Sequence, residues 1–416
     1  MEMIKVTFPD GSVHEFEKGV KILDVAISIS EGFARNVLGA VVNDDIIKGL
    51  SETLKEDCTV KFVKFEDKEG KEIFWHTSSH VMALAIQRLF PDTKFGIGPA
   101  IENGFYYDLD SEHKFTPEDL EKIEAEMKKI VKEGYSVDRK EVDRDFALKY
   151  FAEKGQDYKI DLIEGFDKDA ELSFYELGEF TDLCRGPHLV DVKKIKAVKL
   201  LSIAGAYWRG SEKNKMLQRI YGITFEKKKD LDEYLEFLED AKQRDHRKIG
   251  KELGIFMISQ NVGAGLPFWL PKGATIRRVV ERYIVDKEIE CGYEHVYTPI
   301  LANVDLYKTS GHWDHYQDSM FPPMDLGNGE LLVLRPMNCP HHMEIYNNDV
   351  HSYKEFPIRI AELGMMHRYE MSGTLSGLQR VREMTLNDAH IFVRPDQIKE
   401  EFTRVVNLMK SVYEDF

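Results

Sequence analysis

The stretch that decides the fold reads MHRYEMSGTLSGLQRVREMTLNDAHIF and occupies residues 366–392. It predicts two strands joined by a turn rich in serine and glycine. Successive side chains of a strand alternate between faces, so Arg368 and Glu370 are expected to share a face, as are Asp388 and His390. A hairpin that directs arginine, carboxylate and imidazole groups to one surface suits a polar, phosphorylated substrate.

The bulk composition indicates a folded, multidomain protein. The chain has 416 residues, 43% of them hydrophobic, which suits about two to four domains with their own cores. Its four cysteines form no CxxC pair, which favours a reducing compartment. There is no secretory signal pattern and no apolar run of the ~20 residues that span a bilayer, so we expect a cytoplasmic protein without a membrane partner. The net charge of −16 does not advertise nucleic-acid binding, although local basic clusters could still hold phosphate.

Residues 1–63 are predicted to form a small β-grasp module. Apolar Ile4, Val6 and Phe8 alternate with polar residues, and Asp10-Gly11 is a hairpin turn signal. A helix is predicted over residues 22–29.

Residues 64–225 are predicted to form a mixed α+β domain. The charged stretch 66–72 marks the boundary, and helices are expected over 75–90 and 116–134. Thr116 suits the cap of the second helix, Pro117 suits its first turn and Gly134 suits its end.

The remaining chain is predicted to contain a linker, residues 226–244, and a further domain, residues 245–416. A single charged helix is expected over 227–251, and its narrow apolar stripe suits a connector between domains. The last domain should contain a helix over 276–290, a strand over 296–300 and an antiparallel sheet over 359–393. The predicted fold class is therefore α+β and multidomain.

A first group of candidate residues combines histidines and a cysteine. The segment HTSSH places His76 and His80 one helical turn apart, on a different side from the apolar stripe, so the pair is expected off the core face. The segment DLCRGPH, 182–188, contains Gly-Pro, which argues for a loop that projects Cys184 and His188 into a cleft. These four side chains are the donor set of a zinc site, and they equally suit metal-free hydrolysis with a histidine or bound water as base. Both interpretations stay open.

A second group surrounds Cys339, in the segment RPMNCPHH, 335–342. Cys339 and the strand residue His390 are two possible metal ligands, but a zinc site needs at least three from the protein. His341 and His342 are possible additions, as is a residue outside this chain.

Taken together, these segments resemble bacterial threonyl-tRNA synthetases over the whole chain. The similarity is carried by HTSSH, DLCRGPH and RPMNCPHH, together with FGIGPAIENGFYYD (95–108), AGAYWRG (204–210), NKMLQRIYG (214–222), RDHRKIGKELG (244–254) and KTSGHWDHY (308–316). Each segment is weak by itself, but their occurrence in family order is specific. The resemblance implies a TGS domain, an editing domain that hydrolyses mischarged seryl-tRNA(Thr), and the N-terminal part of a class II catalytic domain.

The resemblance also implies a role for each site residue. Arg368, Glu370 and Arg380 would bind ATP, which enters with Mg²⁺, and Arg368 would hold its α-phosphate as threonine attacks. Met337 and Asp388 would line the threonine pocket, and Cys339 and His390 would be two ligands of Zn²⁺. His76, His80, Cys184 and His188 would form the editing site, supported by Lys159 and Asp182.

A zinc ion explains how such an enzyme would separate threonine from valine. An apolar pocket distinguishes a hydroxyl from a methyl by only ~10², whereas a metal can bind the amino and hydroxyl groups of threonine directly. Serine has the same donor groups and lacks only a methyl, so a second, hydrolytic site is the remedy. The implied partners are tRNA(Thr), threonine and ATP, and the complete enzyme is expected to be a homodimer.

Two departures from the family qualify this resemblance. Family members continue beyond Phe416 with a third class II motif, a third zinc ligand and an anticodon-binding domain, so the chain is expected to be a fragment that retains deacylation but not threonine activation. Glu383 replaces the usual glycine and should weaken ATP binding unless an arginine such as Arg382 pairs with it. The alternatives are a stand-alone aminoacyl-tRNA deacylase and a non-catalytic RNA-binding protein.

Overall fold

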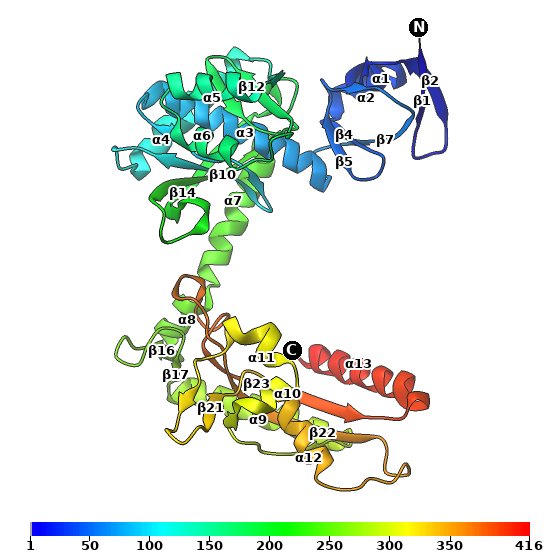
Figure 1. Cartoon of the computed structure of the whole chain (residues 1–416), viewed down its shortest axis with the longest axis vertical. Coiled ribbons are helices and arrows are strands. Elements are labelled where there is room, and N and C mark those ends of the chain that lie inside the picture. The colour runs from blue at the N-terminus through cyan, green and yellow to red at the C-terminus, as the bar shows by residue number, and fades with distance from the viewer. Residues whose placement is uncertain (1) are drawn as a thin grey trace. The chain divides into compact units, whose positions relative to one another are not determined.

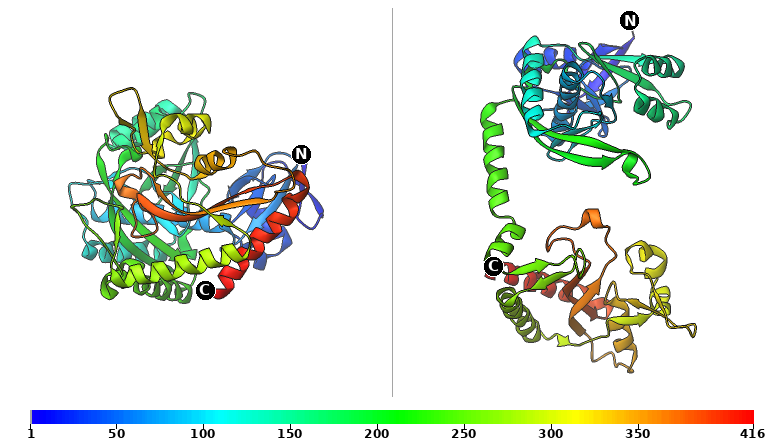
Figure 2. Two further views of the ribbon diagram at one scale, coloured as in Figure 1. Left: turned by 90° about the horizontal axis from the view of Figure 1, so that it is seen from below. Right: turned by 90° about the vertical axis from the view of Figure 1, so that its left-hand side faces the viewer.

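The computed structural model describes residues 2–416. It divides into two compact units, Met1–Phe237 and Leu238–Phe416. Each unit combines helices with its own sheets, so the predicted α+β multidomain class is confirmed (Figure 1 and Figure 2). Among the residues that the structure describes, no helix is both long enough and apolar enough to cross a membrane.

The first 63 residues form the β-grasp module. Its sheet has, in order, β2 (Val13–Glu17), β1 (Met3–Thr7), β7 (Cys58–Val63), β4 (Gly39–Val42) and β5 (Ile46–Gly49). The other elements are β3 (Val20–Lys21), α1 (Ile22–Ile29), α2 (Glu31–Asn36) and β6 (Thr53–Leu54). The predicted hairpin and helix are confirmed, and Ile4 and Val6 of β1 share a buried core with Val25 of α1.

The rest of the first unit is built around α3 (Lys68–Leu89) and α4 (Pro117–Glu133). One sheet contains β14 (Ala197–Tyr207), β15 (Met216–Phe225), β10 (Gly104–Asp110) and β8 (Lys94–Phe95), with β9 (Ala100–Ile101) beside β10. A second contains β11 (Asp138–Val142), β12 (Leu172–Leu177) and β13 (Phe180–Leu183), near the helices α5 (Arg144–Glu153) and α6 (Asp157–Glu164). Helix α3 packs against β10 and α4, and α4 also packs against β14 (Figure 1).

Helix α3 differs from its prediction in two ways. It begins at Lys68 rather than near Trp75, because lysine and glutamate in the charged stretch are good helix formers. It is also buried on nearly every side, with Thr77, Ser78 and Ser79 inaccessible and His80 only 1% exposed. The expectation that the histidine pair lies off the core face is therefore wrong for His80, because the protein covers the polar side of the helix as well as its apolar stripe.

The predicted single helix over 227–251 is two helices, α7 (Lys228–Gln243) and α8 (His246–Leu253). The interruption has a local cause. The Asp245 carboxylate accepts a hydrogen bond from the backbone N–H of Arg247 at 2.8 Å, so Asp245 caps a new helix.

The second unit holds a sheet in the order β18 (Glu294–His295), β22 (Ile358–His367) and β23 (Glu383–Phe392). Its helices are α9 (Pro271–Glu290), α10 (Val304–Thr309), α11 (His312–Tyr316), α12 (Cys339–Asn347) and α13 (Ile398–Asp415). Its shorter strands are β16 (Phe256–Ile258), β17 (Pro267–Trp269), β19 (Leu301–Asn303), β20 (Met324–Asp325) and β21 (Leu331–Leu334). The antiparallel pairing of β22 with β23 confirms the sheet predicted over 359–393.

Two strand predictions in this unit are wrong. Residues 296–300 lie between β18 and β19 rather than in a strand, and the backbone N–H of Thr298 instead donates to the Glu362 carboxylate at 3.0 Å. Strand β22 ends at His367, so Arg368 and Glu370 lie in the connection to β23 and do not share a strand face. The first strand of the 366–392 stretch thus ends at His367, earlier than the alternating pattern predicted.

Candidate functional site

The structure brings together the four side chains of the first group. His76 and His80 come from α3, and Cys184 and His188 come from the loop after β13. Their donor atoms all lie within 4.8 Å of one another. The His188 ring lies 4.2 Å from that of His76 and 4.3 Å from that of His80, measured between centroids. Residues distant in sequence therefore form one compact cluster.

Cys184 is at the centre of this cluster. Its Sγ lies 3.0 Å from Nε2 of His188 and 3.4 Å from Nε2 of His76. The backbone N–H of Gly186 donates to the same sulfur at 3.1 Å. Burial raises the pKa of the thiol above its ordinary value, so a neutral SH is expected at pH 7 when no metal is bound.

The tautomer of His188 follows from its contact with Thr77. The Thr77 hydroxyl donates to the carbonyl of Ile73 at 2.8 Å and accepts from the N–H of Leu189 at 2.9 Å. Its proton is thus committed, so Nδ1 of His188, 3.3 Å away, must donate to it. Nε2 of His188 consequently carries a lone pair on the side of Cys184.

A buried charged group supports the cluster. Asp182 accepts a hydrogen bond from the Tyr107 hydroxyl and forms an ion pair with the Lys159 ammonium, and its Oδ2 lies 3.3 Å from Nε2 of His80. Burial acts to raise the pKa of Asp182, but the charge of Lys159 and the hydrogen bond from Tyr107 outweigh it and lower that pKa. An ionised Asp182 fixes Nε2 of His80 as a donor, which leaves Nδ1 of His80 buried without a partner among the described residues.

The histidines are neutral in this environment. Burial lowers the pKa of His76 to about 3 and that of His80 to about 4, and it lowers the pKa of His188 well below its ordinary value. Three neutral imidazoles and one cysteine fit the donor set of zinc, and the orphaned Nδ1 of His80 is an available acceptor. Neutral imidazoles with free lone pairs also suit general-base hydrolysis, so the donor set fits both interpretations.

The second group also forms a cluster. Cys339, the first residue of α12, lies with Asp388 and His390 of β23, and their donor atoms are within 4.8 Å of one another. The strand alternation that places Asp388 and His390 on one face is present as predicted. Cysteine, histidine and carboxylate are all zinc ligands, so these residues fit a zinc ion.

His390 is oriented by a buried chain of hydrogen bonds. Its Nδ1 lies 2.9 Å from Nδ1 of His342, whose Nε2 lies 3.2 Å from the Glu362 carboxylate. Glu362 is held in turn by Arg335 at 3.2 Å. Burial acts to raise the pKa of Glu362, but hydrogen bonds from Thr298 and the charge of Arg335 lower it.

The predicted ATP-binding residues lie in the connection between β22 and β23. Nε of Arg380 donates to the Glu370 carboxylate at 2.8 Å, so the two side chains are paired with each other. Arg368 is half-buried, and its Nε has no partner among residues 2–416. Met337 is half-buried, two positions before Cys339.

Glu383 is not paired with Arg382. The guanidinium of Arg382 donates to the carbonyl of Glu370 at 2.9 and 3.0 Å. The Glu383 carboxylate instead lies 3.5 Å from Nε2 of His367, its partner across the two strands.

Several residues of these sites escaped the sequence reasoning. Thr77 contacts His188 of the first cluster, Tyr107 donates to the supporting Asp182, and Glu362 supports the second cluster. Thr77 lies between the two histidines but looks like an ordinary helix residue, and Tyr107 and Glu362 sit in strands among similar neighbours. No pattern in the sequence marks them.

Comparison with known proteins identifies three domains along the chain. A TGS domain matches residues 4–64, a "Threonyl and Alanyl tRNA synthetase second additional domain" matches residues 172–221, and a "tRNA synthetase class II core domain (G, H, P, S and T)" matches residues 324–416. A threonine–tRNA ligase from Geobacillus sp. (strain WCH70) is 62% identical over 415 residues, covering 100% of this chain and 64% of the relative.

Over its whole length the chain is similar to threonine–tRNA ligases. A second relative, threonine–tRNA ligase 1 of Bacillus subtilis (strain 168), is 61% identical over 415 residues, which cover 100% of this chain and 64% of that protein. The RNA-binding domain of a threonyl-tRNA synthetase from Cryptosporidium parvum Iowa II is 39% identical with a TM-score of 0.40, over 41% of this chain and 42% of that structure. The chain thus spans about two-thirds of the length of its curated threonyl-tRNA synthetase relatives.

Proposed function

We propose that this chain takes part in the ATP-dependent attachment of threonine to tRNA(Thr) and hydrolyses mischarged seryl-tRNA(Thr). The observation that carries the proposal is the identity of 62% to a threonine–tRNA ligase over 415 residues. The cluster of His76, His80, Cys184 and His188 supports the hydrolytic part, because it brings three imidazoles and a thiol within 4.8 Å of one another.

The hydrolytic step breaks the ester bond between serine and the terminal ribose. A water oxygen forms a bond to the seryl carbonyl carbon, the ribose oxygen leaves, and that oxygen takes up a proton. His76 and His188 are the candidates to accept the proton of the attacking water, because both imidazoles are neutral and His188 presents a lone pair at Nε2, although the depressed pKa of each makes it a weaker base than a free histidine. The ammonium of Lys159 and the hydroxyl of Tyr107, 3.1 Å apart, supply polar groups beside the histidines.

If a zinc ion binds in this cluster, His76, His80, Cys184 and His188 are the residues that would hold it. A zinc ion there would polarise the water or the ester carbonyl. The residues around the cluster keep the same functions in either case: Asp182 orients His80, and Thr77 orients His188.

The synthetic part is assigned to residues of the second unit. We propose that Arg368, Glu370 and Arg380 bind ATP with its Mg²⁺, and that Met337 and Asp388 contact threonine. Cys339 and His390 would hold a Zn²⁺ that supplies a coordination site for the amino and hydroxyl groups of threonine, which valine cannot fill. The Glu370–Arg380 pair must open for both side chains to reach a nucleotide.

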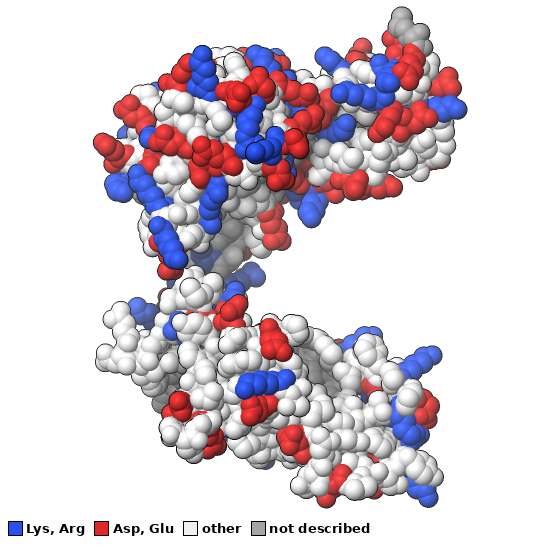
Figure 3. All heavy atoms as spheres, in the orientation of Figure 1, with Lys and Arg blue, Asp and Glu red and all other residues white. Residues whose placement is uncertain are grey.

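The partner tRNA(Thr) would be bound by local groups rather than by a uniformly basic face. On the face shown in Figure 3, acidic and basic side chains are interspersed. With a net charge of −16, long-range attraction would not favour tRNA, so contacts to its backbone should come from individual lysines and arginines. The cytoplasmic location and the homodimer remain predictions.

Two assays on the same preparation test this proposal. Release of serine from seryl-tRNA(Thr) tests the hydrolytic part, with His76→Ala expected to slow release by about 10²-fold or more. Threonine-dependent ATP–pyrophosphate exchange tests the synthetic part. Serine release without exchange would confine the activity of this chain to deacylation, and tRNA binding with neither activity would favour the non-catalytic alternative.

A further inference from the structure

Gly49, the last residue of β5 in the β-grasp module, lies directly against the loop that carries His188. A Cβ atom at position 49 would lie 3.0 Å from the carbonyl oxygen of His188 and 3.4 Å from Cβ of Pro187. The φ angle of Gly49 is not in the positive region, so its backbone conformation is open to other residues. A side chain at this position would therefore press on the His188 backbone, which would have to move by a few tenths of an ångström.

Gly49 is itself held in place by Glu52. The Glu52 carboxylate accepts a hydrogen bond from the N–H of Gly49 at 2.8 Å, and the N–H of Glu52 donates to the carbonyl of Gly49 at 3.1 Å. The following backbone is tied to α1, because the N–H of Leu23 donates to the carbonyl of Leu50 at 2.9 Å. The backbone of Gly49 is thus held in place where the loop packs against it.

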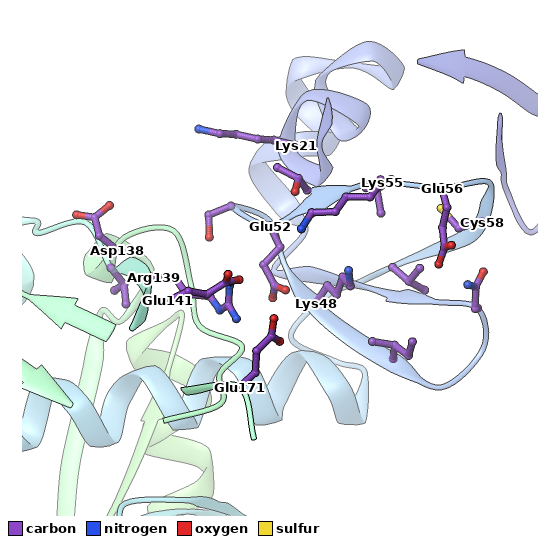
Figure 4. Close-up of a pocket in the computed structure, with 17 residues that line it drawn as sticks. Lys21, Lys48, Glu52, Lys55, Glu56, Cys58, Asp138, Arg139, Glu141 and Glu171 are labelled. Atoms are coloured by element: carbon purple, nitrogen blue, oxygen red, sulfur yellow. The ribbon is translucent and has the colours of Figure 1, made fainter. Parts of the chain in front are cut away.

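Glu52 also lines a cavity of about 650 Å³ (Figure 4). Glu52 enters from the β-grasp module, and Arg139 and Glu171 enter from the opposite wall (Figure 4). Glu52 is thus half-buried in the wall of the cavity, where its carboxylate accepts the hydrogen bond from Gly49.

The same loop is anchored to the β-grasp module beyond His188. Val190 packs against the core of that module. The ammonium of Lys194 donates to the carbonyls of Arg35 and Val37 at 2.7 and 3.1 Å, at the end of α2. The loop is consequently supported by the β-grasp module both at and after His188.

On its other side, His188 has little room to move. Its ring lies 4.4 Å from that of Tyr175 between centroids, and the residue is 2% exposed. A displacement of the His188 carbonyl would move the His188 ring. It would therefore change the 3.0 Å distance between Nε2 of His188 and the Cys184 sulfur.

We propose that Gly49 and Glu52 are positioning residues of the hydrolytic site: the β-grasp module sets the place of the His188 backbone and thereby the geometry of the His188–Cys184 contact. This inference rests on the proposed deacylation of seryl-tRNA(Thr). It makes the β-grasp module a structural part of that site, although no side chain of residues 2–63 forms a hydrogen bond with the cluster.

The experiment compares two graded substitutions, Gly49→Ala and Gly49→Val, with Gly32→Ala. A Cβ at Gly32 meets nothing closer than 4.0 Å, so this variant is the matched control in the same module. Deacylation of seryl-tRNA(Thr) should lose several-fold in kcat for Gly49→Ala and up to about 10²-fold for Gly49→Val, with KM little changed. Glu52→Ala should reduce kcat, whereas Glu52→Gln should restore it, because the amide oxygen still accepts from Gly49.

The second readout is independent of catalysis. The ring nitrogen and proton resonances of His188 should shift in both Gly49 variants and stay unchanged in Gly32→Ala. A wild-type kcat and unshifted His188 resonances in Gly49→Ala and Gly49→Val would overturn the inference, as would equal losses in Glu52→Ala and Glu52→Gln. If the wild-type chain releases no serine, the proposed function fails, but the His188 resonances still decide the positioning. Should Gly49→Val not fold, the smaller displacement in Gly49→Ala carries the test.

Discussion

Nδ1 of His390 lies 2.9 Å from Nδ1 of His342. Only one of these nitrogens can carry the shared proton. Nε2 of His342 must donate to the Glu362 carboxylate, 3.2 Å away, so Nδ1 of His342 is the acceptor and Nδ1 of His390 is the donor. Nε2 of His390 is then left with a lone pair, which is the form of histidine that binds a metal.

This relationship predicts that His342 supports metal binding without being a ligand. His342→Ala should weaken Zn²⁺ binding at the Cys339 cluster by about 10- to 100-fold, because the ring of His390 loses its orientation. Competition with a chelating dye measures the affinity, and His351→Ala is the control, since His351 contacts Glu355 instead. An unchanged affinity in His342→Ala would remove the proposed support.

Zinc content should separate the two clusters. Cys339→Ser is expected to lower the zinc stoichiometry, because the cluster keeps only Asp388 and His390 from the group. Cys184→Ser should lower it further only if the hydrolytic site also binds zinc. Elemental analysis of the wild type, both single variants and the double variant measures this. A wild-type zinc content in Cys339→Ser would contradict the assignment of the second cluster.

Glu383 should oppose ATP binding. Arg382 is engaged by the carbonyl of Glu370, and the neighbouring His367 is buried, which lowers the pKa of its imidazole more than Glu383 raises it. The carboxylate is thus not neutralised by a permanent cation. Glu383→Gly should tighten ATP binding by about fivefold, equivalent to ~1 kcal/mol of repulsion.

Calorimetric titration with ATP provides the measurement for this variant. Glu383→Gln removes the charge but keeps the size of the side chain, so it should recover most of the gain. A gain in Glu383→Gly that is absent from Glu383→Gln would point to backbone freedom rather than charge.

The carboxylate of Asp119 should stabilise the first unit. It accepts hydrogen bonds from Thr116 at the start of α4 and lies 2.7 Å from His113 and 2.9 Å from Lys122. Asp119→Ala should lower the free energy of unfolding by about 1–2 kcal/mol at pH 7. Asp145→Ala is the control, because Asp145 is an exposed residue in the first turn of α5.

The pH dependence of this effect has a definite sign. The hydrogen bond with His113, followed by that with Lys122, lowers the pKa of Asp119 below its ordinary value. Its stabilisation is complete above the ordinary aspartate pKa of ~3.9 and is lost as the pH falls through the lowered value. Denaturant unfolding should therefore show a gap in the free energy of unfolding between wild type and Asp119→Ala that persists down to about pH 5 and narrows only in stronger acid. A gap that closes near neutral pH would contradict this.

Most of the fold could be predicted from the sequence, because local signals agreed with tertiary packing. The capped helix predicted over 116–134 appears as α4, since Thr116 and Gly134 act at its ends independently of the rest of the molecule. The break between α7 and α8 was missed because a capping aspartate inside a charged stretch looks like any other surface residue. Arg368 and Glu370 were misplaced because alternation of residue types does not reveal where a strand ends.

The candidate sites were only partly predictable for a different reason. Cysteines and histidines are rare and chemically distinctive, so Cys184 and His188 could be singled out within one short segment. The residues that orient them are ordinary: Thr77 acts through a hydroxyl whose proton is already committed, and Gly49 acts through the lack of a side chain. Such roles exist only in three dimensions, where chain segments far apart in sequence meet.

The burial of α3 on nearly every side restricts how the hydrolytic site could be redesigned. His76 and His80 stand on the part of the helix that is almost fully buried, residues 73–86, so a bulkier or smaller neighbour there would disturb the core of the whole domain. Cys184 and His188 stand instead on a loop that is packed against the β-grasp module. Substitutions intended to change the shape of the site should therefore begin in that loop and its supports, because they leave the packing of the helix intact.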